Sequence, residues 1–340
     1  MTLLNGYAAA VQAGAKLGAN IKFFFDGEEE IGSPHLREFL ATHRDLLLSD
    51  LWIVVDGPTH SSGRKMVVFG VRGDVNIGLT VYGPNRALHS GHYGNWAPNP
   101  AAVLVNLLAS MKDDHGRVLI KGFYDDVTAL TTDERQALAT IPAADADLQR
   151  ELGLGSIEDP GRSLLESIHL PSLNINGIQS ANVGPAAANI IPVSAKAVLD
   201  LRLVLGNNVD RQVGKVVAHI RAQGFTLLDR EPTDADRAQH ARLIRVDRRP
   251  GNNAQRTSMD LPLAKSVVIA VQSTVDYPVI RQPSMGGTLP LAVIEQVLGA
   301  KVVIVPVVNH DSNHHAENEN VKVQSLWEGI ETCAALMAMR

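Results

Sequence analysis

Apolar residues recur along this chain with two different periods, and the change of period divides it into segments. Residues 1–18 place apolar side chains at helical spacing, which predicts an amphipathic helix that ends at a glycine. Unbroken apolar runs at residues 21–25 and 51–56 predict two buried strands, with a helix over residues 35–48 between them. This order of strand, helix and strand is typical of an α/β domain, in which ligands bind at the carboxyl edge of the sheet.

The pattern changes near Arg72, where strict alternation replaces the buried runs. Residues 74–83 and 194–206 alternate apolar and polar side chains, which predicts half-exposed antiparallel strands. Helices are expected at residues 99–112, 131–139, 143–152 and 209–224, and a third strand at residues 241–249. Elements grouped in this way predict an α+β domain inserted into the first one.

The α/β pattern returns after residue 260. Helices are expected at residues 261–274, 286–299 and 322–339, with a buried strand at residues 301–308. The sequence therefore predicts one domain built from residues 1–71 and 251–340, interrupted by an inserted domain at residues 72–250.

Composition places the chain among ordinary globular proteins. Of its 340 residues, 45% are hydrophobic and 20% are charged, and the net charge of −5 offers no basic surface for nucleic acid. No apolar run approaches the roughly 20 residues that span a bilayer, and the N-terminus lacks the basic segment of a secretory signal. The single cysteine, Cys333, fits a reducing compartment. We therefore expect a cytoplasmic protein with neither a nucleic-acid nor a membrane partner.

The stretch DGEEEIGSP, residues 26–34, places four carboxylates at the end of a predicted strand. Carboxylates this close repel one another, and burying them is costly without a nearby positive charge. A solvated turn is one explanation. A metal site is another, because Asp56 ends the next strand and three histidines follow the last strand, within residues 310–315. A hydrolytic metal site also needs one carboxylate that is not a ligand, to accept a proton from bound water.

Five short motifs follow one another along the chain: DGEEEIGSP, IVVDGP, RGDVNIGLTVYGPNRALHSGHYG, GGTLP and HHAENEN. Together they resemble the co-catalytic zinc peptidase and amidohydrolase family that includes carnosinase, glutamate carboxypeptidase, aminoacylase, acetylornithine deacetylase and succinyl-diaminopimelate desuccinylase. The long insert and the EEEIGSP form are most similar to the dipeptidase branch. The resemblance implies an α/β fold, with a mixed-sheet catalytic domain that is incomplete at its N-terminus and an inserted α+β lid or dimerisation domain.

The resemblance also implies roles for the charged motifs. Glu29 matches the general base and Glu30 a metal ligand. Asp56 matches the ligand of a second metal ion. His315 matches the histidine ligand, and the tandem His314 leaves a slip of one residue open. Two divalent ions are thus implied, zinc first, with manganese or cobalt as alternatives.

Further matched residues concern the substrate. His89 matches a histidine that the insert of a homodimer sends into the neighbouring subunit's site, where it helps to bind the substrate carbonyl oxygen. Arg202 matches an arginine that holds a substrate carboxylate, a bidentate task that suits a guanidinium; a surface arginine on a strand is the alternative. Gly286, Gly287 and Thr288 match a loop against the same carboxylate, where a helix start offers backbone N–H groups, and a simple helix cap is the alternative.

The chain departs from the family upstream of its acidic run. The family carries a histidine in a His-x-Asp pattern and an aspartate that bridges the two metals, whereas no histidine precedes His35 and no aspartate precedes Asp26. We therefore expect a chain without the first segment of the catalytic domain. Glu30, His315 and Asp56 alone are too few ligands to hold two ions tightly, so slow turnover is expected.

The expected activity is metal-dependent hydrolysis of a peptide or amide bond in small substrates with a free carboxylate, above all dipeptides. One alternative is a deacylase of the same fold that acts on N-acyl amino acids, and a substrate panel separates the two. Another is a catalytically impaired homologue that only dimerises, which metal content separates from the enzymes.

Overall fold

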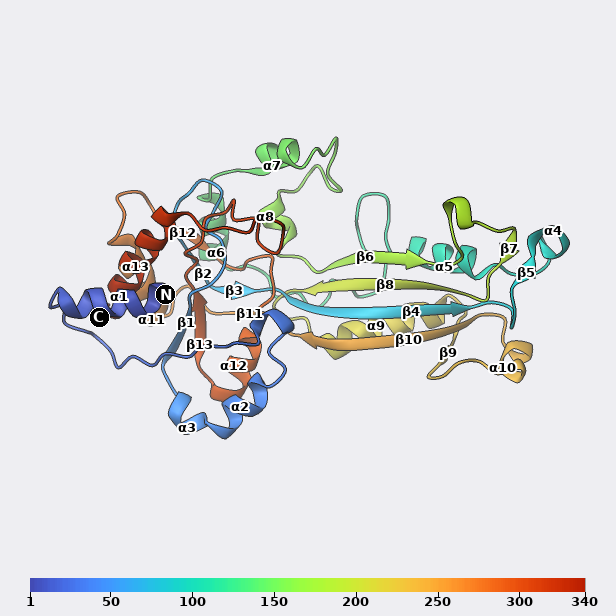
Figure 1. The fold of residues 1–340 in the computed structure, drawn as a ribbon, viewed down its shortest axis with the longest axis horizontal. Coiled ribbons are helices and arrows are strands. Elements are labelled where there is room, and N and C mark those ends of the chain that lie inside the picture. Colours follow the sequence, from blue (N-terminus) through green and yellow to red (C-terminus); the bar gives the residue numbers. More distant parts are fainter. Residues whose placement is uncertain (340) are drawn as a thin grey trace. The chain divides into compact units, whose positions relative to one another are not determined.

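The computed structural model describes residues 1–339, which form two compact units (Figure 1). The base unit comprises Met1–Arg72, Ala129–Gly155 and the chain from Ala254 onward. The insert unit comprises Gly73–Thr128 and Ser156–Asn253. Residues 129–155, expected within the inserted domain, therefore belong to the base unit instead.

The base unit contains, in chain order, α1 (Thr2–Gln12), η1 (Glu29–Ile31), α2 (Leu36–Thr42), α3 (Arg44–Leu47), β1 (Leu51–Val54), β2 (Met66–Val68), β3 (Gly70–Val71), α6 (Thr132–Ala139), α7 (Asp145–Glu151), β11 (Gln255–Arg256), α11 (Pro262–Gln272), β12 (Ile280–Gln282), α12 (Leu291–Leu298), β13 (Lys301–Ile304) and α13 (Val323–Met337). The insert unit contains β4 (Gly73–Tyr82), β5 (Leu88–His89), α4 (Ser90–Tyr93), α5 (Pro100–Ala109), α8 (Leu164–Ser167), β6 (Ser172–Gln179), η2 (Gly184–Ala186), β7 (Ile190–Ile191), β8 (Ser194–Leu203), α9 (Val209–Ala222), β9 (Thr226–Leu228), α10 (Asp234–Gln239) and β10 (Leu243–Asn252).

A four-stranded mixed sheet organises the base unit, in the order β1-β13-β2-β12. β1 pairs in parallel with β13, and β12 pairs in parallel with β2, whereas β13 and β2 are antiparallel. Val67 and Val303 from the two central strands are fully buried in one core with Val267 of α11. This mixed sheet, interrupted by a separate α+β unit, confirms the fold class expected from the sequence.

The expected buried strand at residues 21–25 is not formed. These residues belong to no strand, and Phe25 is 63% exposed. The neighbouring β1 is an edge strand that pairs only with β13, and its side chains are half-buried rather than buried. Phe24 packs on other rings instead, with centroids 5.3 Å from Trp52 and 5.9 Å from Phe39. The prediction was wrong because an apolar run shows which side chains avoid water, not whether a backbone partner lies beside it.

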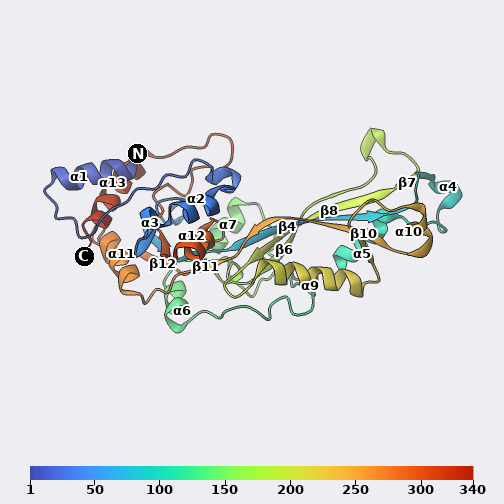
Figure 2. The ribbon, with the colours of Figure 1, turned by 90° about the horizontal axis from the view of Figure 1, so that it is seen from below.

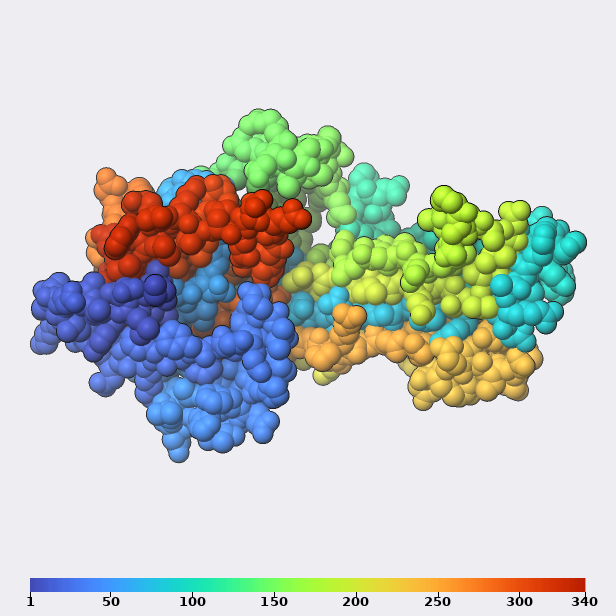
Figure 3. Space-filling view, in the orientation of Figure 1, coloured from blue at the N-terminus to red at the C-terminus, as the bar shows by residue number. Residues whose placement is uncertain are grey.

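The first and last helices of the base unit lie side by side. Figure 3 shows the N-terminal segment in blue against the C-terminal segment in red, and α1 packs along α13. Gly6 permits this close approach, because a Cβ atom there would lie 2.5 Å from the Cβ of Cys333. Burial raises the pKa of the Cys333 thiol to about 11, so the thiol stays protonated and packs as a small apolar side chain.

The insert unit is built on a five-stranded sheet in the order β6-β8-β4-β10-β9. β4 and β8 pair antiparallel along their whole length, from Gly73 opposite Leu203 to Tyr82 opposite Ser194. β6 forms one edge, antiparallel to β8, and β9 forms the other edge, parallel to β10. The alternating strands expected at residues 74–83 and 194–206 are therefore confirmed.

Helices α5 and α9 cover one face of the insert sheet (Figure 2). Their apolar residues, such as Leu104 and Val216, share a single buried core with alternate residues of β4 and β8, such as Ile77 and Leu199. Residues on the opposite face, such as Asn76 of β4, are only partly buried. The two-residue period of the sequence thus corresponds to one covered and one polar face.

A buried ion pair holds residues 129–155 in the base unit. The Nε atom of Arg256 lies 2.9 Å from Oε1 of Glu134, and the two side chains are 7% and 5% exposed. The other carboxylate oxygen of Glu134 accepts the backbone N–H of Thr131, which completes the capping box of α6. Burial lowers the pKa of Arg256, yet an arginine stays charged in proteins. Each buried charge of the pair is therefore compensated only by the other.

The helices of this protein are short compared with a bilayer. The longest, α13, has 15 residues. No helix among residues 1–339 is long and apolar enough to cross a membrane.

Replacing Arg256 by Met should lower the free energy of unfolding by about 3–5 kcal/mol, because it leaves a buried carboxylate without its counter-charge. Urea denaturation followed by circular dichroism measures the change. The matched control is Arg150→Met, which breaks a pair with Asp147 whose side chains are both 76% exposed. That control should cost no more than about 1 kcal/mol. Equal effects of the two substitutions would contradict the role given to the buried pair.

Candidate active site

The acidic run forms a tight turn that its first carboxylate closes. Oδ1 of Asp26 accepts the backbone N–H of Glu28 at 2.8 Å, and Oδ2 accepts the hydroxyl of Ser33 at 2.7 Å. Between these points lies η1, one turn of 3-10 helix over Glu29–Ile31. Gly32 then adopts a left-handed backbone with φ 84°, which glycine reaches at little cost. Asp26 therefore acts as the clamp of the turn, a role that the sequence reasoning did not assign to it.

The next carboxylates of the turn each meet a histidine. Oε2 of Glu28 lies 2.9 Å from Nδ1 of His35, and this hydrogen bond raises the pKa of the exposed His35. Oε2 of Glu30 lies 2.9 Å from Nε2 of His315, which is 285 residues further along the chain. The structure thus brings together Glu30 and His315, two residues that the sequence analysis matched to metal ligands.

Glu29 is the exception among these carboxylates. Within residues 1–339, its side chain makes no hydrogen bond and no ion pair. Partial burial raises the pKa of Glu29, and the neighbouring negative charges, Asp56 foremost, raise it further. A half-buried carboxylate with a raised pKa and no structural partner has the properties of a proton acceptor in catalysis.

Glu29, Glu30 and Asp56 border one cavity of about 1000 Å³ in the base unit. Asp56 follows β1, and its Oδ1 accepts the backbone N–H of Gly57 at 2.8 Å. The rest of the wall is largely apolar and includes Trp52 and the phenylalanines of residues 23–25. The other charged residues that line this cavity are Lys22, Asp26 and Asp50.

The histidines lie in a loop with an unusual backbone, the histidine loop, between β13 and α13 (residues 309–322). Asn313, His315 and Asn318 all have positive φ angles, between 54° and 60°. Such left-handed conformations cost a residue other than glycine about 1–3 kcal/mol and occur where the surroundings impose them. The loop is tied internally, since the N–H of Asn320 donates to the carbonyl of Ser312 at 2.8 Å.

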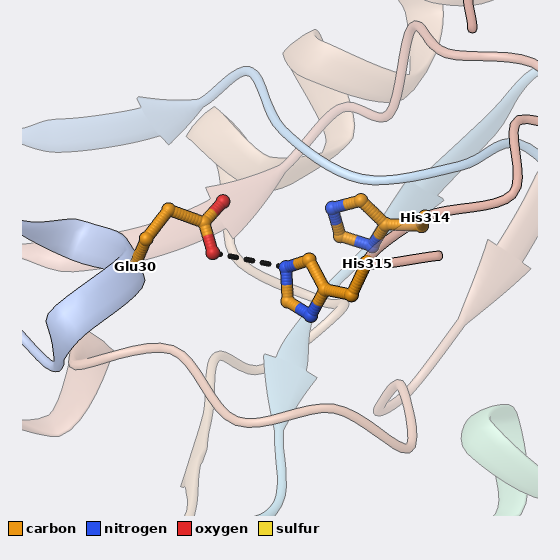
Figure 4. Close-up of side chains that lie close together, drawn as sticks. All are labelled: Glu30, His314 and His315. Atoms are coloured by element: carbon orange, nitrogen blue, oxygen red, sulfur yellow. Dashed lines mark ion pairs between the residues drawn. The ribbon is translucent and has the colours of Figure 1, made fainter. Parts of the chain in front are cut away.

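Glu30, His314 and His315 form the metal-ligand cluster of the base unit. Their donor atoms all lie within 4.8 Å of one another, and no other group of three or more such side chains is found among residues 1–339. Figure 4 shows the carboxylate and the two imidazole rings close together. Carboxylate oxygen and imidazole nitrogen are ligands that zinc takes, so these residues fit a divalent ion. Asp56 is not part of this cluster, although it lines the same cavity as Glu30.

The loop of Gly286, Gly287 and Thr288 does not open a helix, contrary to expectation. The carbonyl of Gly287 accepts the backbone N–H of Arg72 at 3.2 Å, and α12 begins only at Leu291, after Pro290. Proline restrains the residue before it from helical conformation, which delays the helix beyond this loop. The backbone N–H groups of residues 286–288 therefore belong to a loop and not to a helix N-terminus.

His89 lies in the insert unit and is exposed at the end of β5. Its Nδ1 accepts the backbone N–H of Gly91 at 3.0 Å, which caps α4. A neutral imidazole that accepts at Nδ1 carries its proton on Nε2, so the ring presents an N–H donor. The ring of His92 lies 4.6 Å away between centroids.

Arg202 also belongs to the insert unit, on the polar face of β8. Its Nε donates to Oδ2 of Asp200 at 2.9 Å, and the side chain of Arg202 is 35% exposed. Asp200 thereby orients the arginine without covering it. The alternative of a surface arginine on a strand remains compatible with this placement.

Residues 72–225 match the peptidase dimerisation domain of the M20 peptidases. The chain is 27% identical over 339 residues to the human Beta-Ala-His dipeptidase. The aligned region covers 94% of this chain and 62% of that protein. It is 26% identical over 337 residues to the Cys-Gly metallodipeptidase of Schizosaccharomyces pombe. That alignment covers 96% of this chain and 68% of the other protein. The chain thus spans less than two thirds of the length of the first relative.

Solved structures share the fold. An M20 family metallo-carboxypeptidase of Sulfolobus solfataricus superimposes with a TM-score of 0.84 at 24% identity, over 99% of this chain and 74% of that one. Human carnosine dipeptidase 1 superimposes with a TM-score of 0.76 at 24% identity, over 99% of this chain and 70% of that one. The resemblance predicted from the motifs is thereby confirmed, including its similarity to the dipeptidase branch.

Proposed function

We propose that this chain, a member of the M20 peptidase family, carries the site of a metal-dependent hydrolase that cleaves dipeptides with a free carboxylate. The observation that carries the proposal lies in one turn, where a ligand carboxylate and an unpartnered carboxylate are adjacent. Glu30 contacts His315, and Glu29 beside it has no partner within residues 1–339. The names of two relatives, which act on β-Ala-His and Cys-Gly, support dipeptides as the substrate class.

In this proposal the two glutamates have different tasks. Glu30 and His315 hold a divalent ion, zinc first, and Asp56 contributes to a second ion if two are bound. When bound, such ions supply Lewis acidity to the scissile carbonyl and lower the pKa of water. Glu29 accepts the proton of the attacking water and delivers it to the leaving amine, because its carboxylate is not engaged elsewhere.

The insert unit supplies the remaining groups. His89 donates its Nε2 hydrogen to the substrate carbonyl oxygen, where negative charge develops during attack. Arg202 holds the free carboxylate of the substrate, with its guanidinium oriented by Asp200. The loop of Gly286, Gly287 and Thr288 lies against the same carboxylate and contributes backbone N–H groups.

We also propose a homodimer that forms through the insert unit. β6 is an edge strand with exposed apolar side chains, since Ile175 is 38% and Ile178 is 55% exposed. An exposed edge of this kind can pair with a second strand. The match of residues 72–225 to a peptidase dimerisation domain supports a dimer through this unit.

A cytoplasmic location is proposed from the cysteine usage. The one cysteine, Cys333, is a buried free thiol, which suits a reducing compartment.

With zinc or manganese added, the purified chain should release amino acids from Cys-Gly and β-Ala-His faster than from N-acetyl amino acids. The reason is the proposed preference for small substrates that end in a free carboxylate and begin with an amine. Amino-acid release quantified by chromatography gives the rates. Faster cleavage of the N-acetyl compounds would identify a deacylase instead. A chain that binds no metal and hydrolyses neither class would instead be a homologue that only dimerises.

Glu29→Gln should keep the metal content of the native chain and lose turnover by about 10²–10⁴-fold, because the amide cannot accept a proton. Glu30→Gln should instead lose metal, because it replaces a charged ligand. Elemental analysis of both variants, beside their rates on Cys-Gly, separates the two roles. The reverse result, with metal lost only in Glu29→Gln, would show that the two assignments must be exchanged.

Glu29→Gln and His89→Ala subunits, each inactive alone, should regain activity when mixed and allowed to exchange. In a symmetric dimer with His89 acting on the partner's site, each mixed dimer keeps one intact site, so about a quarter of native activity is expected. Light scattering of the mixture confirms that dimers are present. Mixed dimers without any activity would show that His89 acts within its own subunit, and full activity of His89→Ala alone would show that it has no catalytic part.

A further inference from the structure

The cavity of about 1000 Å³ in the base unit lies between two segments of the chain, and we call it the slot. Every residue from 18 to 27 and every residue from 47 to 56 borders it. Side chains of an extended chain point alternately to opposite sides, so a cavity on one face would touch only every second residue. The slot therefore adjoins the backbone edges of both segments and not only the side chains of one face.

The two segments follow the slot in the same direction. Nζ of Lys22 donates to the carbonyl oxygen of Leu48 at 2.7 Å, just before β1. Further along both segments, the rings of Phe24 and Trp52 lie 5.3 Å apart between centroids. These two contacts hold the segments on either side of the slot through side chains alone.

The backbones that border the slot lack partners there. Within residues 1–339, no backbone N–H or C=O group of residues 21–25 makes a hydrogen bond. β1 pairs with β13 along one edge, and no strand of the described chain pairs with its other edge. A polypeptide strand between two such edges can bond to both, because a strand carries N–H and C=O groups on each of its sides.

The size and the lining of the slot suit one strand. Five residues of a strand extend about 17 Å in a layer about 10 Å thick, with about 4.8 Å to each neighbouring strand, and so occupy roughly 800 Å³. The slot is slightly larger, at about 1000 Å³. Helices α12 and α13 contribute apolar side chains to its walls, such as Ile294 and Leu336. A strand that carries apolar side chains would pack against them.

We propose that the slot binds one extended, largely apolar strand from the part of an M20 peptidase that these 340 residues do not contain. The length of a relative supports this source, because the human Beta-Ala-His dipeptidase aligns with the chain over only 62% of its own length. The bound strand would join residues 21–25 and β1 into one continuous sheet. This inference goes beyond the proposed function and depends on neither metal nor substrate.

The test uses the whole chain and the unaligned part of the human Beta-Ala-His dipeptidase, made as overlapping peptides of about 12 residues, longer than most strands. Trp52 is the reporter because it lines the slot, whereas Trp96 and Trp327 are 79% and 64% exposed and can be replaced by phenylalanine. One peptide per chain should bind and shift the emission of Trp52 to the blue. It should also slow hydrogen exchange at the backbone N–H groups of residues 21–25 and 51–55.

Phe24→Asp and Val323→Asp form a matched pair of variants. Phe24 lines the slot, whereas Val323 begins α13, is 67% exposed and does not line the slot. A carboxylate in the slot should weaken binding of the peptide by about 10-fold or more, and the control should leave it unchanged. Circular dichroism verifies that both variants remain folded.

A change in the peptide gives a test that does not depend on the folding of a variant. The same peptide with a proline at its centre should bind the native chain about 10-fold more weakly or worse, because proline lacks an N–H group for the sheet. Equal binding of the proline peptide would identify a general apolar pocket and overturn the proposal.

The proposal is also overturned if no peptide of the set binds, or if the bound peptide leaves residues 21–25 and 51–55 exchanging freely. Slow exchange of both segments in the chain alone, at every concentration, would show that they pair directly with each other. Slow exchange only at high concentration, with a dimer in light scattering, would show that a second copy occupies the slot. Either result would contradict the proposed occupant and leave the roles of Glu29 and Glu30 untouched.

Discussion

The accumulation of negative charge in one turn is the constraint on which the candidate site depends. Two carboxylates about 4 Å apart repel by about 1 kcal/mol in water and by about 4 kcal/mol near a protein surface. The structure relieves three of the four carboxylates of the turn. Asp26 accepts hydrogen bonds from the turn itself, and Glu28 and Glu30 each meet a histidine. Glu29 makes no hydrogen bond or ion pair within residues 1–339, and burial and the nearby charge of Asp56 raise its pKa.

The histidine loop is held in its shape by its own contacts. Two of its three left-handed residues are asparagines, which tolerate this conformation, and the third is His315. Lys322 binds Asp311 at 2.7 Å, and the backbone N–H of Lys322 donates to Oδ1 of Asn309 at 2.8 Å. The ion pair of His315 with Glu30 is 65–70% exposed, and pairs of this kind contribute about 1 kcal/mol or less. A cation bound to Glu30 and His315 would stabilise the same conformation further, because metal binding favours the conformation that holds the ligands.

The two units contribute different kinds of group. The base unit, with its mixed sheet and the clamped turn, holds the carboxylates and the histidine cluster. The insert unit holds His89 and Arg202, both on a sheet whose covered face is packed by α5 and α9. Residues 129–155 join the base unit although they interrupt the insert in sequence, because Glu134 finds its counter-charge in Arg256.

The sequence by itself determined the periodic elements and the motif residues. The alternation in β4 and β8 and the helical spacing in α9 and α13 are local properties of the sequence. They show directly which face of each element is buried. The late start of α12 could also have been read from the sequence, because Pro290 precedes it. Tertiary structure alone decided other features. Residues 21–25 form no strand because no strand within residues 1–339 lies beside them to pair with. The placement of His314 beside Glu30 depends on one left-handed backbone and on a contact between segments 285 residues apart, neither of which any local pattern encodes.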